Sequence, residues 1–391
     1  NRSVTRILLA TFWLLFFVVA CSPRPIHFMR EGPEASRPPK VAGGKIKPLW
    51  KFDTGKGYGS ADALLWPVER DGHVYAAEPG GRVYALDIVT GRVVWETDLD
   101  LSLSSGLGLG KEWIVVASDE GELLSLNRLD GVQRWRVQIG AEILARPVVS
   151  SETILLRTGN GQVLGIDGQT GSVRWQVQHS VPSLSVHGLS APLDMDNVAI
   201  VGFASGYLSG IDITTGRELW NTPIARSTGT NQIDRLIDID ADPFWVDGVL
   251  YVAAYQGGVT ALSLESRKLI WRSNKSTLRN LVANQELLLV TVDDGSLSAL
   301  DLETGEDLWG QSALVGRGVS NPVVVGSGVT GAVGDFEGYV YLVDLVSGKL
   351  VRRGRARGGA VIGLFGSDMS GVFYSLSENG VITAWKLPPA E

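Results

Sequence analysis

The sequence predicts an all-β fold: an eight-bladed β-propeller of four-stranded antiparallel blades, in which the N-terminal strand closes the last blade. Two observations predict it. The stretch ALDIVTGRVVW at residues 85–95 returns in approximate copies almost to the C-terminus. Each copy lies in a unit of about 40 residues that holds several short strand-like runs, which is the period of a propeller blade.

The repeat can be aligned on one position that recurs at intervals of 40, 40, 45, 51, 38, 43 and 42 residues. The aligned residues are Asp87, Asn127, Asp167, Asp212, Ser263, Asp301, Asp344 and Lys386. In six copies a tryptophan follows eight residues later, at Trp95, Trp135, Trp175, Trp220, Trp271 and Trp309. We expect each tryptophan to pack against the next blade of the ring.

Each unit contains runs that are typical of antiparallel hairpins. The first unit holds HVYAA (73–77), RVYALD (82–87) and RVVWETDL (92–99), separated by PGG and TG turn signals. The Thr-Gly pair supplies the positive φ that a tight turn needs, and the preceding Asp can accept backbone N–H bonds across the turn. Most units begin with an X-Pro pair at the start of a strand, where the N–H that proline lacks is not needed for strand pairing. These prolines are Pro67, Pro147, Pro192, Pro243 and Pro322.

The two ends of the chain complete one blade. The eighth copy stops at Lys386, directly after VITAWK, and therefore lacks its tryptophan-bearing outer strand. The segment PLWKF at 48–52, with Trp50, matches that missing strand. Pairing the two ends closes the ring and leaves no free sheet edge there.

The first residues predict a secretory signal and a lipid anchor. Arg2 and Arg6 precede an apolar run from Ile7 to Ala20, which suits a signal-peptide core better than a membrane-spanning helix. The run ends in Val-Val-Ala-Cys at 18–21, which resembles a bacterial lipobox, so that Cys21 would be the lipidated residue of a membrane-anchored protein. The alternative, a buried N-terminal helix, lacks an amphipathic pattern. Ser22, rather than Asp, after the cysteine favours the outer membrane.

We therefore predict three parts: a signal peptide at 1–20, a lipidated flexible tether at 21–45 and the propeller at 46–391. The tether prediction rests on the proline, glycine and charge content of this segment, which has too few apolar residues to fold. Without the first twenty residues the chain has an excess of acidic over basic side chains, so nucleic acid is not an expected partner.

Few residues point to enzymatic chemistry. The four histidines, at 27, 73, 179 and 187, form no HExxH motif, and no GxSxG nucleophile elbow is present. No metal site and no cofactor is predicted. The repeat nevertheless resembles that of pyrroloquinoline quinone-dependent dehydrogenases, which share the propeller. Cys21 is the only cysteine, which excludes the vicinal disulfide often found in that family and speaks against enzymatic activity. Because the repeat is shared, a quinone-dependent dehydrogenase is kept as the alternative interpretation.

Two connections between blades are unusual. Residues between Trp175 and Pro192 and between Trp220 and Pro243 link an outer strand to the next inner strand, so both should lie on one face of the ring. In the second, Asp238, Asp240 and Asp242 alternate with apolar residues, which would place three carboxylates on one side of an extended segment. Calcium binding, a solvated edge and an acidic docking patch all fit this pattern; the unusual length of the loop favours docking.

The strings VPSLSVHGLSAP (181–192) and TGTNQIDRLIDIDADP (228–243), with the lipobox and the eight repeats, resemble the BamB family of lipoproteins. Members of that family are subunits of the outer-membrane β-barrel assembly machinery. The resemblance implies docking of these two connections onto the POTRA domains of the barrel-forming subunit. It implies contact residues at Leu184, Val186, His187, Asp238 and Asp240.

The expected function is therefore a non-enzymatic scaffold that is anchored to the periplasmic face of the outer membrane and promotes insertion of outer-membrane proteins. Unfolded outer-membrane proteins are a second class of expected partner. The sequence departs from the family pattern at Val186 and His187, where leucine and arginine are common, and a mostly neutral histidine weakens the charged anchor. Arg352 in the seventh blade and Arg267 in the fifth replace the repeat's tryptophan and turn glycine; we expect these two to affect blade packing only.

Overall fold

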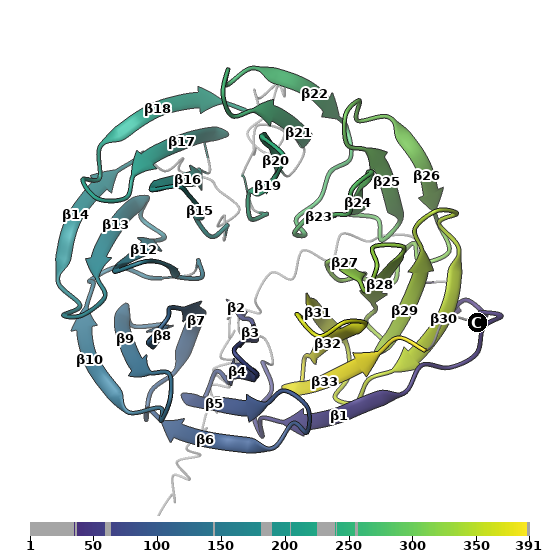
Figure 1. The fold of residues 1–391 in the computed structure, drawn as a ribbon, viewed down its shortest axis with the longest axis horizontal. Coiled ribbons are helices and arrows are strands. Elements are labelled where there is room, and N and C mark those ends of the chain that lie inside the picture. Colours follow the sequence, from purple (N-terminus) through teal and green to yellow (C-terminus); the bar gives the residue numbers. More distant parts are fainter. Residues whose placement is uncertain are drawn as a thin grey trace, which may run out of the picture. The chain divides into compact units, whose positions relative to one another are not determined.

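The computed structural model describes residues 35, 37–58, 64–143, 145–180, 190–203, 205–224, 239, 241–254 and 257–388. These residues form eight antiparallel sheets arranged as the blades of a closed ring (Figure 1). The predicted all-β, eight-bladed propeller is confirmed. We number the blades 1 to 8 along the chain, from β3 in blade 1 to β31 in blade 8.

Every blade has the same order of strands from the centre of the ring to its rim. The inner strands are β3 (Val68–Arg70), β7 (Leu103–Leu109), β11 (Val148–Ser150), β15 (Leu193–Met195), β19 (Phe244–Val246), β23 (Val282–Ala283), β27 (Val323–Val325) and β31 (Val361–Gly366). The second strands are β4 (His73–Ala77), β8 (Trp113–Ser118), β12 (Thr153–Arg157), β16 (Val198–Gly202), β20 (Val249–Ala254), β24 (Leu287–Thr291), β28 (Thr330–Gly334) and β32 (Val372–Ser377).

The third strands are β5 (Arg82–Asp87), β9 (Glu122–Asn127), β13 (Gln162–Asp167), β17 (Tyr207–Asp212), β21 (Gly258–Ser263), β25 (Leu297–Asp301), β29 (Tyr339–Asp344) and β33 (Val381–Lys386). The outer strands are β6 (Val93–Asp98), β10 (Gln133–Gln138), β14 (Val173–Gln178), β18 (Glu218–Pro223), β22 (Leu269–Ser273), β26 (Asp307–Gln311), β30 (Leu350–Arg355) and, in blade 8, β1 (Pro48–Asp53). Each of the five predicted X-Pro pairs directly precedes an inner strand.

The N-terminal strand closes the ring as predicted. β1 pairs antiparallel with β33, with Trp50 opposite Ala384 and Asp53 opposite Val381. One addition was not predicted: the short strand β2 (Leu64–Leu65) pairs in parallel with β7, so that blade 2 has five strands.

The core lies between neighbouring blades, because the second and third strands bury side chains on both faces. All six residues of β8, for example, are buried, whereas the outer strand β10 of the same blade alternates exposed and half-buried residues. This is the pattern expected of strands that are covered by a sheet on each side.

The repeat tryptophans join each outer strand to the next blade. Their indole N–H groups donate to the backbone carbonyl of the residue that follows the aligned Asp position, over 2.7–3.1 Å. The bonds run from Trp50 to Ile88, Trp95 to Arg128, Trp135 to Gly168, Trp175 to Ile213, Trp271 to Leu302 and Trp309 to Leu345. The expectation that each tryptophan packs against the next blade is met at these six seams.

The turn glycine is required because the indole ring lies directly against it. Gly131 has φ 72°, and a β-carbon added there would come within 2.5 Å of the Trp95 ring. Only glycine therefore satisfies both the backbone conformation and the packing at this seam.

The seam between blades 4 and 5 departs from this arrangement at Arg267. This residue has φ 56° in the place of the glycine, and its side chain lines a small cleft together with Trp220 and Leu264. Within the described residues Trp220 makes no hydrogen bond to the next blade. Arg267 therefore lies beside Trp220 at this seam, in place of the glycine found at the regular seams.

The seam between blades 7 and 8 departs at Arg352, for a different reason. Blade 8 has no Thr-Gly turn, because its third and outer strands come from opposite ends of the chain. The chain before β1 fills this place instead: Gly43 N–H donates to Val351 over 2.9 Å, and Lys45 forms a parallel bridge with Arg353. No tryptophan is needed where there is no turn to cover.

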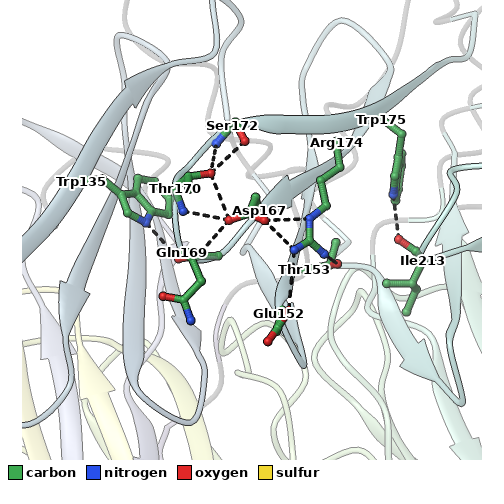
Figure 2. Close-up of polar contacts among 11 residues, drawn as sticks. Trp135, Glu152, Thr153, Asp167, Gln169, Thr170, Ser172, Arg174, Trp175 and Ile213 are labelled. Carbon is green, nitrogen blue, oxygen red and sulfur yellow. Dashed lines mark hydrogen bonds and ion pairs between the residues drawn. The ribbon is translucent and has the colours of Figure 1, made fainter.

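In five blades the aligned residue is an Asp that organises the turn before the outer strand. Figure 2 shows blade 3, where one Asp167 oxygen accepts hydrogen bonds from the Thr170 backbone N–H (2.8 Å) and hydroxyl (3.0 Å). The other oxygen forms an ion pair with Arg174 at 2.6 Å. The Arg174 guanidinium, together with the bonds from Thr170, lowers the pKa of Asp167 from 3.8 to about 2. The carboxylate is therefore held in its charged form.

We predict that Gly131→Ala costs about 1–3 kcal/mol of stability more than an alanine at a turn glycine that faces solvent. Gly72→Ala is the matched control, since Gly72 also has positive φ (76°) but nothing within 4 Å of an added β-carbon. Chemical denaturation of both variants measures the difference. Equal losses of stability would show that the contact with Trp95 does not constrain the seam.

We predict a pH-dependent contribution from Asp167. Because its pKa is lower in the folded protein, its stabilisation is complete above pH 3.8 and is lost as the pH falls towards 2. Asp167→Asn should therefore lower the melting temperature at pH 6, and the gap to the parent protein should shrink below about pH 4. A gap that stays constant from pH 6 to about pH 2.5 would contradict this assignment.

Candidate functional site

The connections from each outer strand to the next inner strand lie on one face of the ring, which we call the junction face. The turns between second and third strands lie on the same face. In six blades the first residue after the outer strand donates its N–H to the carbonyl of the glycine in that turn, as in Leu99 to Gly81 (3.1 Å) and His179 to Gly161 (2.9 Å). The blade architecture therefore holds the bases of these connections in fixed positions.

The first junction comprises residues 179–192 between β14 and β15, and the second comprises residues 224–243 between β18 and β19. The predicted contact residues Leu184, Val186, His187, Asp238 and Asp240 lie outside the described residues, as does the predicted lipidation site Cys21. The described bases of the two junctions are His179, Ser180, Ser190–Pro192, Ile224, Ile239 and Ala241–Pro243. Their contacts show how the junctions are held.

Asp242 connects the two junctions. Its carboxylate accepts a hydrogen bond of 2.6 Å from the backbone N–H of Ala191 at the end of the first junction. The same carboxylate accepts a bond of 3.2 Å from the Asn280 side chain, whose oxygen in turn accepts the Asp242 N–H at 2.9 Å. Arg146 lies 3.7 Å away and adds a cation. One half-buried carboxylate thus joins the connections that enter blades 3, 4, 5 and 6.

The predicted alternation of the second junction holds where the structure describes it. Ile239 and Ala241 are both fully buried, and Ile239 packs against Gly202 of β16. Asp242 is half-buried on the other side of the chain. Ile239 and Ala241 therefore anchor the end of this junction in the core between blades, whereas Asp242 is only half-buried.

Arg157 holds the end of the first junction. This arginine on β12 is buried, and its guanidinium donates to the hydroxyl (2.9 Å) and the carbonyl (3.3 Å) of Ser190. It also lies over the ring of Phe203, 5.7 Å from the centroid. A cation that is stacked on an aromatic ring and donates two hydrogen bonds is well compensated for its burial.

His179 lies at the other end of the first junction, directly after β14. Its ring stacks on Phe203 at 3.9 Å between centroids, and its Nε2 lies 3.7 Å from Glu218. Burial lowers the pKa of His179, and Arg157 acts in the same direction against the opposing effect of Glu218. His179 is therefore neutral at pH 7, and Arg157 carries the positive charge of this cluster.

Burial alone would raise the pKa of Glu218. Hydrogen bonds from Ser209 (2.7 Å) and Asn221 (3.1 Å) outweigh that effect and lower the pKa. This carboxylate is therefore charged, and its Oε1 accepts both bonds within the blade.

Sequence reasoning missed the roles of Arg157, Phe203, Asn280 and Asp242 as supports. Asp242 was recognised as part of the acidic alternation but not as an internal contact. Arg146, Ala191 and Asp242 each directly precede a proline that lies just before an inner strand. This shared position was the signal that could have indicated a contact among them. No pattern in the sequence marked Arg157 or Phe203.

Two structural findings concern ligands and membranes. Within the part of the chain that the structure describes, no group of three or more histidine, cysteine or acidic side chains could hold a metal ion. The same residues include no helix that is long and apolar enough to cross a lipid bilayer.

The chain is similar to solved structures of two kinds. The crystal structure of BamB from Moraxella catarrhalis has 27% identity and a TM-score of 0.79, and the match covers 88% of this chain and all of that one. A quinohemoprotein alcohol dehydrogenase from Comamonas testosteroni has a TM-score of 0.68 at 14% identity, covering 89% of this chain and 78% of the other. The second likeness concerns the fold alone.

Sequence comparisons identify the family. The outer membrane protein assembly factor BamB of Legionella pneumophila is 41% identical over 347 residues, which cover 88% of each chain. A family model described as outer membrane protein assembly factor BamB matches residues 44–103 and 80–311. The chain therefore belongs to the BamB family of outer membrane protein assembly factors.

Proposed function

We propose that this protein is a non-enzymatic scaffold subunit of the outer-membrane β-barrel assembly machinery, which binds the POTRA domains of the barrel-forming subunit through its first and second junctions. In this proposal Cys21 carries a lipid that anchors the protein to the periplasmic side of the outer membrane. Binding promotes assembly and insertion of outer-membrane proteins without any bond-making step.

The observation that carries this proposal is the convergence of the two junctions on Asp242. A carboxylate that accepts the Ala191 N–H from the first junction and belongs to the second holds the ends of both at a fixed separation. Such fixed loops on a rigid frame are the usual carriers of binding function. Leu184 and Val186 would supply an apolar contact, and Asp238 and Asp240 would meet basic groups, with His187 beside them.

Preorganisation explains why the frame matters for affinity. Loops that are ordered only on binding lose conformational entropy at that moment, which weakens the complex. Arg157 and His179 fix the two ends of the first junction, while Ile239 and Asp242 fix the end of the second. The blades thus reduce the ordering cost before any partner arrives.

We predict that the double variant Asp238→Arg with Asp240→Arg abolishes co-purification with the barrel-forming subunit. Placing cations opposite the partner's basic groups replaces attraction with repulsion, and losing one member of a buried charge pair typically costs roughly 2–5 kcal/mol. The matched control is Asp119→Arg with Glu120→Arg, two exposed neighbouring acids on the junction face of blade 2. Co-purification of the Asp238 and Asp240 variant at the parent level would reject this face as the docking site.

We predict that Asp242→Ala weakens binding to the POTRA domains although Asp242 is committed to internal contacts. Loss of the hydrogen bonds to Ala191 and Asn280 leaves backbone and amide groups unpaired, at a cost of about 1–3 kcal/mol, and frees the two junctions from each other. Titration calorimetry with soluble POTRA domains should show a dissociation constant raised about tenfold, since 1.4 kcal/mol corresponds to a factor of ten. Asp194→Ala, an exposed acid on β15, serves as the control. An unchanged constant for Asp242→Ala would contradict a positioning role.

A further inference from the structure

Basic residues are concentrated at one place on this acidic protein, which we call the basic strip. It comprises residues 37–51, residues 349–357 and Lys386. Eleven of the chain's 35 lysine and arginine residues lie in these segments, which contain no acidic residue. The rest of the chain therefore has 24 basic against 42 acidic residues. The charge of the protein is strongly asymmetric.

The fold brings the three segments together at the seam between blades 7 and 8. Residues 43–46 lie along the free edge of β30, with Lys45 paired in parallel with Arg353. Pro48, the first residue of β1, lies opposite Trp385, next to Lys386. The carbonyl of Pro39 accepts a bond of 2.9 Å from the Arg353 guanidinium. β30 and β1 adjoin on the outer rim, so the strip faces outward from the ring (Figure 1).

Five lysines of the strip are available to a ligand. Lys45, Lys47, Lys51, Lys349 and Lys386 are exposed, and none of them forms an ion pair with an acidic side chain within the described residues.

Two acids border the strip. Asp53 accepts the Gly55 N–H over 2.9 Å, and Asp344 accepts the Ser347 N–H over 2.7 Å. Both carboxylates keep their charge, and the hydrogen bonds from Ser347, together with Lys349, lower the pKa of Asp344. The eleven basic residues of the strip outnumber these two acids.

Exposed apolar side chains accompany these cations. Leu49 on β1 is 46% exposed, and Val346, in the turn that precedes Lys349, is 80% exposed. A surface that combines lysines and arginines with protruding aliphatic side chains is typical of proteins that lie at a lipid interface.

We propose that the basic strip binds the surface of an anionic phospholipid membrane. The inference rests on the proposed lipid anchor at Cys21, because the chain that would carry that lipid enters the fold along this strip. Only fifteen residues separate Cys21 from Arg37 in the sequence, and this short chain keeps the strip close to the membrane that holds the lipid. The lipid holds the protein near the membrane, and a polybasic surface adds electrostatic attraction to anionic lipids.

The strip and the proposed docking face lie on opposite sides of the ring. The seam between blades 7 and 8 is about half a turn away from blades 3–5, whose connections meet at Asp242 (Figure 1). The protein can therefore rest on the membrane with the rim at this seam and keep the junction face of blades 3–5 away from the membrane. The acidic remainder of the surface, which an anionic membrane repels, favours the same orientation.

Vesicle co-sedimentation tests this proposal. The protein is the chain from Ser22 onward, which lacks the lipidated cysteine and keeps the whole ring, since β1 closes it from within residues 48–53. Vesicles contain either phosphatidylcholine alone or phosphatidylcholine with about one-third phosphatidylglycerol, and each lysine or arginine near an anionic surface adds roughly fivefold to the partition. We expect binding only to the anionic vesicles, and we expect added salt to weaken it.

The test variant carries Lys45→Glu, Lys47→Glu, Lys51→Glu and Lys349→Glu. The matched control changes the net charge equally at exposed positions outside the strip, with Arg92→Glu, Lys111→Glu, Arg217→Glu and Lys268→Glu. The strip variant should lose at least about tenfold in partition, and the control should stay within about twofold. Equal partition of the two variants, or no binding of the parent to anionic vesicles, would overturn the proposal.

Two further readouts separate this inference from the proposed docking. Binding of soluble polyglutamate without binding of vesicles would assign the strip to an acidic protein partner and reject the membrane. The lipidated full chain with the strip variant should still co-purify with the barrel-forming subunit, because the junctions are unchanged. Unchanged co-purification of the variant with Asp238→Arg and Asp240→Arg, with vesicle binding intact, would count against the docking proposal alone.

Discussion

The bond from an outer-strand tryptophan to the next blade is the interaction on which the rest of this structure depends. Each blade alone exposes both faces of its second and third strands, and these become a core only when another blade covers them. The indole closes the rim of the seam, its N–H satisfies a backbone carbonyl, and its ring leaves room only for glycine at the facing turn. Hydrogen bonding and packing therefore select the same residues in successive units.

At the two seams that lack this bond, either the turn glycine or the turn itself is missing. At the seam between blades 7 and 8 the ring closes, and the segment before β1 takes the place of the turn, next to Arg352. At the seam between blades 4 and 5, Arg267 takes the place of the glycine in the turn between β21 and β22. The first departure adjoins the surface to which we assign the membrane, and the second lies between the two blades that the second junction connects. The regular seams between these two departures keep the membrane-binding and partner-binding surfaces at a constant distance.

Much of the fold was predictable because a repeat places the same physical requirements in every unit. The number of blades follows from the repeat period, the aligned Asp, the tryptophan and the X-Pro pairs. The closure through Trp50 follows from the absence of a tryptophan-bearing outer strand after Lys386. The pairing of β2 with β7 was not predictable, since a strand of two residues carries no periodic signal. The supports of the junctions were also missed: Arg157 and Phe203 contact Ser190 and His179 across blades, and such contacts depend on packing that no local pattern records.

The predicted contact residues themselves, from Leu184 to Asp240, rest on resemblance to the BamB family and on the geometry of the ends that hold them. Hydrogen exchange of the full chain with and without soluble POTRA domains tests most directly whether both junctions engage one partner at once. We predict that binding slows exchange in residues 181–189 and 225–240 together and leaves the seam between blades 7 and 8 unchanged. Slowed exchange in only one junction, or at the basic strip instead of the junctions, would contradict the view that the ring holds two loops for a single docking event.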